Sequence, residues 1–269
     1  MERPETIFKF EPFSLQALQN LKTACFYFGS PLDFNDPYDC AIDAQLDQLS
    51  EQDAILVRDS FLADAAMNEL QKAAVNEFTI DQLKQQIADG AQKAIDTAKK
   101  NFLDTKGVTC FSEANENLLM WSHYGDKYRG FCLEFRTEFE PFNKLKKVEY
   151  VAEMPTLSTR DIGLNVEHGM AIEKLFCTKS TDWSYEMEWR VIHANAKQVY
   201  TYRPEALKAI YFGPRMPDQN VDLLCLILYS QIPDVRLFRG KKNPQSFRVD
   251  FSEITGYIPY AEARRQGKT

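Results

Sequence analysis

The chain has 269 residues, of which 44% are hydrophobic and 26% are charged, and this composition is that of a globular protein rather than a disordered one. Its formal net charge of −7 argues against non-specific binding to a nucleic-acid backbone, because such binding needs clustered cations. No apolar run approaches the roughly 20 residues that a membrane span requires, so we predict no membrane association.

The N-terminus and the cysteines indicate a cytoplasmic protein. Charged residues stand within the first 13 residues, where a secretory signal would be apolar. The six cysteines are scattered without a C-x-x-C pair, which is typical of reduced thiols. We predict no metal site, because three histidines and unclustered cysteines supply no ligand spacing.

The N-terminal part predicts two strands, a helix and a turn. Residues 7–10 and 25–28 have the apolar patterns of short strands, and Ser14 can cap the helix between them. Residues 34–39, Phe-Asn-Asp-Pro-Tyr-Asp, predict a turn, because Asn and Asp side chains bond nearby backbone amides. The turn is either a structural loop or a ligand contact in which Asn35 and Asp36 bind a ribose or a base edge.

The next segment has a helical composition. Residues 47–103 contain no proline, and Thr79 with Gln82 forms a capping box before a run of apolar residues at helical spacing. We expect two or three amphipathic helices. They would form a helical insertion at about residues 47–105 within a single domain that spans residues 1–269.

The remaining chain returns to a strand pattern. Ser112 is expected to cap a helix through residues 118–125, and residues 221–229 predict a buried helix. Further strands are predicted at residues 108–111, 131–135, 147–151, 188–193, 209–212, 235–238 and 247–251. Because helices and strands do not alternate regularly, the predicted fold class is α+β, with a mixed, bent β-sheet and the helical insertion packed beside it.

Met-Trp-Ser-His-Tyr at residues 120–124 has two interpretations. Trp121 and Tyr124 share one helix face, so both can pack into a core. In a functional interpretation, the two rings stack on a flat ligand while His123 is a general acid–base or a ligand donor.

Tyr-Glu-Met-Glu-Trp-Arg at residues 185–190 places Glu186, Glu188 and Arg190 on one face of a strand. The three charges form either a surface ladder or a site in which Arg190 holds one carboxylate while the other faces a ligand. Lys9 lies between two phenylalanines and is either solvated or directed toward a phosphate.

Four stretches together resemble the bacterial domain of unknown function 2971 family. They are Phe8-Lys9-Phe10; Phe26–Pro31 with the Phe34–Asp39 turn; Thr109–Ser112 with Leu119–Gly125, which contains Met-Trp-Ser-His-Tyr, and Gly130–Cys132; and Lys179 with Trp183 and Tyr185–Arg190. The resemblance runs from about Ile7 to Gly213 and implies no established activity. Glu11 departs from the family, in which arginine often occupies that position.

The Glu-x-Glu pair also resembles the catalytic motif of arginine-directed ADP-ribosyltransferases. In those enzymes the second glutamate binds the nicotinamide ribose and stabilises the oxocarbenium-like cation. The resemblance implies NAD as substrate, with Glu188, Glu186 and His123 as catalytic residues. Lys9, Asn35, Asp36, Trp121, Tyr124 and Arg190 would bind the nucleotide. Similar small bacterial domains occur among toxins and phage-defence effectors, and this is an analogy only.

Two other functions stay open. In the first, the chain is a non-catalytic sensor or interaction module, and its helices at residues 47–105 bind a protein partner or a second copy. In the second, Asp36, Asp39, Glu186 and Glu188 hold Mg²⁺ in a nuclease. The negative net charge disfavours the nuclease, because little would hold a phosphodiester.

Overall fold

The computed structural model describes residues 3–41, 44–165, 174–232 and 234–267. They divide into two compact units. Unit 1 comprises Met1–Ser30, Gly107–Val148 and Asp182–Thr269, and unit 2 comprises Pro31–Lys106 and Glu149–Thr181. Helices accompany a large mixed sheet, which confirms the predicted α+β class.

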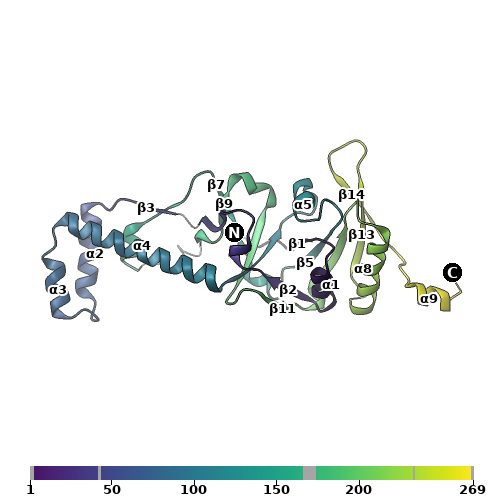
Figure 1. The fold of residues 1–269 in the computed structure, drawn as a ribbon, viewed down its shortest axis with the longest axis horizontal. Coiled ribbons are helices and arrows are strands. Elements are labelled where there is room, and N and C mark those ends of the chain that lie inside the picture. Colours follow the sequence, from purple (N-terminus) through teal and green to yellow (C-terminus); the bar gives the residue numbers. More distant parts are fainter. Residues whose placement is uncertain (1–2, 42–43, 166–173, 233, 268–269) are drawn as a thin grey trace. The chain divides into compact units, whose positions relative to one another are not determined.

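Unit 1 is built on a sheet in which eight strands are described (Figure 1). Only β12 and β13 pair in parallel among the described strands of this sheet, so the sheet is mixed. The strand order is β14 (Val249–Glu253), β13 (Arg236–Lys242), β12 (Leu207–Phe212), β5 (Phe131–Arg136), β1 (Thr6–Glu11), β4 (Gly107–Ser112), β10 (Glu188–His193) and β6 (Lys146–Lys147).

The two faces of this sheet are covered differently. Helices α1 (Leu15–Lys22) and α8 (Asp218–Gln231), with the β2–β11 pair (Cys25–Phe28 and Gln198–Thr201), supply residues to the main aromatic core. The short helix α5 (Leu118–His123) covers the opposite face through Met120 and Trp121 (Figure 1). The C-terminal helix α9 is Tyr260–Arg265. We call the face of the sheet that α5 covers the α5-side face.

Three local predictions for unit 1 were wrong. Asn117 caps α5 through its side chain, whereas the Ser112 hydroxyl accepts a bond from the Ala114 amide and ends a strand. Helix α8 is buried on one face only, because Leu223 and its apolar neighbours on the outer face stay exposed. The last strand begins at Val249 rather than at Phe247, whose side chain is 98% exposed.

Unit 2 contains the predicted helices. They are α2 (Glu51–Ala63), α3 (Glu69–Asn76) and α4 (Ile80–Thr105), and α6 (Thr159–Gly163) packs with α2 and α4. The capping box of Thr79 and Gln82 is present at the start of α4, and Asn68 with Gln71 forms a second one at α3. Each satisfies amide groups that a helix start leaves without partners.

Unit 2 extends beyond the predicted insertion of residues 47–105. Strand β3 (Gln45–Leu46) pairs in parallel with β8 (Thr156–Leu157), and β7 (Glu149–Val151) pairs in parallel with β9 (Thr178–Ser180). The β3–β8 pair joins the segment that carries the helices to residues 149–181, and the β7–β9 pair lies within those residues. The strand predicted at residues 147–151 is therefore divided between β6 of unit 1 and β7 of unit 2.

No helix in the described part of the chain is both long enough and apolar enough to cross a bilayer.

Candidate functional site

Three polar side chains and one phenylalanine form a row across the α5-side face of unit 1. In the strand register, Phe8 pairs with Glu134 of β5 and with Ser112 of β4, and Ser112 pairs with Glu188 of β10. Residues that pair directly across a sheet share a face, so these four side chains lie side by side on four neighbouring strands. Glu134, Ser112 and Glu188 are buried. The row therefore carries two buried carboxylates.

Arg190 orients the carboxylate at one end of this row. Its Nε lies 2.7 Å from Glu188 Oε1, and its Nη2 lies 3.0 Å from Oε2. Both side chains are buried, and the Arg190 guanidinium has no exposed surface. The two bonds fix the carboxylate in a planar, bidentate arrangement. The predicted pairing of Arg190 with one of the two glutamates is therefore present.

Glu186 is held by α5. The Tyr124 hydroxyl donates a 2.6 Å bond to Glu186 Oε1, and the Asn117 side chain donates a 3.0 Å bond to the Tyr185 carbonyl. These bonds join α5 to the 3₁₀ segment η4 (Thr181–Glu186), which lies immediately before β10. The structure thus brings Tyr124, Glu186, Glu188 and Arg190 together in unit 1.

Aromatic rings lie around these carboxylates. His123 is exposed at the end of α5, with its ring centroid 6.4 Å from those of Tyr124 and Tyr185. The Trp183 ring is 6.0 Å from that of Tyr185. These partly exposed rings provide flat surfaces beside buried acids.

Trp121 packs inside the protein. Its side chain has no exposed surface, its ring meets that of Phe10 edge to face at 5.1 Å, and its Nε1 donates to the Asn115 carbonyl. In this structure it supports the core under α5 and offers no ring face to a ligand.

Lys9 lies on the other face of the sheet. Strand residues alternate between faces, so Lys9 points away from the side of Phe8. Its ammonium group donates a 3.4 Å bond to the Cys110 carbonyl and lies 3.7 Å from Glu11. Burial raises the pKa of Glu11, although Lys9 counteracts that effect. The sheet therefore separates Lys9 from Glu188 and Arg190.

Glu134 is a feature that the sequence analysis missed. Its Oε1 accepts a 2.6 Å bond from Lys208 Nζ, and its Oε2 accepts a 2.7 Å bond from the Tyr211 hydroxyl. Burial and the bond to Glu134 both raise the pKa of Tyr211, so the phenol remains a hydrogen-bond donor at neutral pH. A charged residue between the apolar residues Leu133 and Phe135 of β5 was the signal that could have found it.

The surroundings of Cys110 disfavour its thiolate form. It pairs with Arg190 across β4 and β10, so it lies on the α5-side face. Burial, followed by the negative charge of Glu188, raises the pKa of the Cys110 thiol well above its ordinary value. A thiol needs its thiolate form to react, and this environment disfavours it.

Asn35 and Asp36 line a pocket of about 320 Å³ in unit 2. Asp36 Oδ1 accepts a 2.9 Å bond from the Tyr38 amide, so the predicted turn is made by a side chain bonding its own backbone. Asp39 also lines the pocket, and its carboxylate lies 3.2 Å from the ammonium group of Lys179, with both side chains about 95% buried. Unit 2 thus has a pocket whose wall contains a buried ion pair.

The described residues contain no group of three or more His, Cys, Asp or Glu side chains placed to hold a metal ion.

Comparison with known proteins finds one family model that matches part of the chain. The model of the family described as "Protein of unknown function (DUF2971)" matches residues 120–191. The match confirms the family predicted from the motifs, and the matched segment includes Tyr124, Glu134, Glu186, Glu188 and Arg190. Searches of the curated proteins and of the solved structures found no match.

Proposed function

We propose that the chain is an NAD-consuming enzyme of the ADP-ribosyltransferase type, with its reaction centre on the α5-side face of unit 1. The observation that carries the proposal is the pair of buried carboxylates, Glu186 and Glu188, each oriented by its own partner beside partly exposed rings. Burying acids is costly unless they are paired, and the partner of Glu186 is Tyr124, which comes from a segment 62 residues away in the chain. A polar contact between distant segments beside a buried ion pair favours a site over a scaffold.

The reaction needs a negative group near a developing positive charge. The bond between nicotinamide and the ribose carbon breaks, and its electron pair leaves with nicotinamide. The resulting oxocarbenium-like cation is stabilised by Glu188, which Arg190 holds in place. The acceptor then forms a bond to the ribose carbon, and its proton passes to Glu186.

The surrounding residues bind the substrate in this proposal. His123 positions ribose hydroxyls, and the Tyr185 ring takes the stacking role that buried Trp121 does not offer. Asn35 and Asp36 line the pocket of unit 2 and are given no role at this reaction centre, which unit 1 supplies alone. Lys9 takes no part, because it lies on the opposite face of the sheet. A toxin or phage-defence effector is the biological role that we infer, by analogy.

Nicotinamide release tests the proposal. The wild-type protein is incubated with NAD, with water as the acceptor, and free nicotinamide is measured by chromatography. We expect release, and we expect Glu188→Gln to slow it at least about 100-fold, as for loss of one electrostatic stabiliser. The matched control is Glu253→Gln, which breaks an exposed glutamate–arginine pair on β13 and β14 and should leave the rate unchanged.

Folding and binding are checked in the same samples. Circular dichroism shows whether Glu188→Gln remains folded, and titration calorimetry shows whether it still binds NAD. Binding without release by the wild-type protein, or equal rates for the wild type and Glu188→Gln, would contradict the proposal.

A second candidate function is a non-catalytic interaction module. It is supported by an apolar groove of about 440 Å³ in unit 2, which is lined by Phe61 of α2, Val75 of α3, Phe78 between α3 and α4, and residues of α4. In this case a second copy of the chain covers the groove, and light scattering of the wild type reports a dimer. Phe78→Glu should then produce a monomer, whereas Leu223→Glu, at a similarly exposed site on α8, should not. A monomeric wild type at all concentrations would contradict this candidate.

A further inference from the structure

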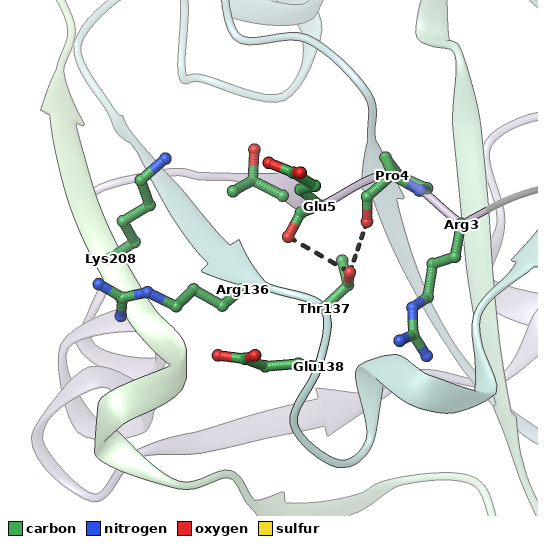
Figure 2. Close-up of a pocket in the computed structure, with 8 residues that line it drawn as sticks. Arg3, Pro4, Glu5, Arg136, Thr137, Glu138 and Lys208 are labelled. Carbon is green, nitrogen blue, oxygen red and sulfur yellow. Dashed lines mark hydrogen bonds between the residues drawn. The ribbon is translucent and has the colours of Figure 1, made fainter.

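A cavity in unit 1 has no part in the proposed reaction. It has a volume of about 630 Å³ and opens where β1 begins and β5 ends (Figure 2). Its volume lies within the range of small-molecule sites. The charged residues that line it are three bases, Arg3, Arg136 and Lys208, and two acids, Glu5 and Glu138.

Hydrogen bonds from Thr137 to backbone carbonyls hold the N-terminal segment that lines this cavity. The Thr137 amide donates a 3.0 Å bond to the Glu5 carbonyl, and the Thr137 hydroxyl donates to the Pro4 carbonyl. Thr6 pairs with Arg136 in the β1–β5 register. The N-terminal segment is thereby tied to the end of β5, so the cavity is formed before any ligand binds.

Two of the bases are anchored by bonds that leave donors available. Arg136 Nη1 donates a 2.6 Å bond to the Glu205 carbonyl, which uses one of its five N–H groups. Lys208 Nζ bonds to buried Glu134 Oε1 and retains two further donors. Both side chains are therefore held at the cavity wall with donors to spare.

The acids and bases of the cavity do not neutralise one another. Among the described residues, Glu5, Glu138 and Arg3 make no ion pair, and Arg136 makes none with either glutamate. Figure 2 shows Arg136, Glu138 and Lys208 on one side of Thr137, with Arg3 on the other side. A ligand that satisfies both kinds of group needs an anionic part and a part that donates hydrogen bonds.

We propose that this cavity binds a phosphorylated sugar or nucleotide. The phosphate is bound by Arg136 and Lys208, because a guanidinium fork and an ammonium group form charge-assisted bonds with phosphate oxygens. Sugar hydroxyls donate to the Glu138 and Glu5 carboxylates. This site is independent of the proposed chemistry at Glu188.

Titration calorimetry with ribose 5-phosphate, ribose and inorganic phosphate tests the assignment. Ribose 5-phosphate should bind more tightly than inorganic phosphate, and ribose alone should give no heat. Arg136→Gln should weaken binding of ribose 5-phosphate at least about tenfold, the effect of losing one charge-assisted bond. The matched control is Arg265→Gln, an exposed arginine on α9, which should bind like the wild type.

One further variant tests the part that the acids play in binding. Glu138→Gln should weaken the binding of ribose 5-phosphate but not the binding of inorganic phosphate. Lys208 is left unchanged, because removing it would strand the buried charge of Glu134. The proposal is overturned if neither ribose 5-phosphate nor AMP binds, or if Arg136→Gln and Arg265→Gln bind ribose 5-phosphate equally.

Discussion

At the scale of single residues, the buried charges of this protein follow one pattern. Glu188, Glu134 and Asp39 are each buried and each bonded to a cation, which is Arg190, Lys208 or Lys179. Removing one partner of such a pair leaves a buried charge uncompensated and typically costs about 3–5 kcal/mol. Substitution of either member of such a pair therefore affects folding, so a test of function at Glu188 includes a check that the variant is folded.

Glu113 offers a test of a partly exposed pair. Its Oε1 accepts 2.7 Å bonds from Lys147 Nζ and from the indole nitrogen of buried Trp189. Burial alone would raise the pKa of Glu113, but the bonds from Lys147 and Trp189 outweigh it and hold that pKa below its ordinary value. Because the pKa of Glu113 is lower in the folded state than in the unfolded state, its ionised carboxylate stabilises the protein above about pH 4.3. This stabilisation disappears as the pH falls through the folded-state pKa.

We expect Glu113→Gln to lower the free energy of unfolding by about 0.5–1 kcal/mol at pH 7, because solvent screens the charged pair. The difference should shrink toward zero on acidification to about pH 3, below the ordinary glutamate pKa. Urea denaturation across this pH range measures it. Glu116→Gln, at an exposed neighbouring position, should show no difference at either pH. A loss that stayed constant with pH would contradict the charge-based explanation.

At the scale of elements, α4 combines strong local signals with one weak position. Thr79 and Gln82 cap its start, and Leu83, Ile87, Ala91 and Ile95 bury one face. Gly90 lies in the middle of the helix, and a Cβ added there would meet no atom within 4 Å. Glycine in a helix interior costs about 0.5–1 kcal/mol relative to alanine, because the unfolded chain gains more freedom.

Gly90→Ala should therefore raise the free energy of unfolding of unit 2 by about 0.5–1 kcal/mol. Gly163, at the end of α6, is the matched opposite case. A Cβ there would lie 3.0 Å from Val57 Cγ1 and 3.2 Å from Ile87 Cγ2, so we expect Gly163→Ala to destabilise the unit. Thermal denaturation of both variants measures the two shifts in midpoint temperature. Shifts of the same sign would contradict the expected steric clash at Gly163.

At the scale of the whole molecule, the chain builds two units from interleaved segments. Unit 1 uses three segments and contains the large aromatic core, and unit 2 uses two segments and has smaller cores around Val57 and Ile95. The composition change at about residue 47 identified the helices of unit 2. It did not identify residues 149–181 as part of that unit, because β7, β8 and β9 are too short to produce a pattern of their own.

The elements that the sequence predicted correctly are those that local physics decides. The strands at Thr6–Glu11 and Glu188–His193 follow from alternation, and α4 follows from its capping box and helical spacing. The grouping of Tyr124, Glu186, Glu188 and Arg190 was also expected, because their motifs are distinctive in sequence. The sequence by itself therefore determined the fold class and most elements.

The tertiary structure alone decided which side chains face one another. Lys9 and Glu188 lie on opposite faces of the sheet, and Glu134 meets Lys208 and Tyr211, which are more than 70 residues away in the chain. Local periodicity states which residues of a strand share a face, but it does not state which strands become neighbours or in what register. Those choices depend on packing between distant segments, since a shift of one residue in the register moves every side chain to the other face.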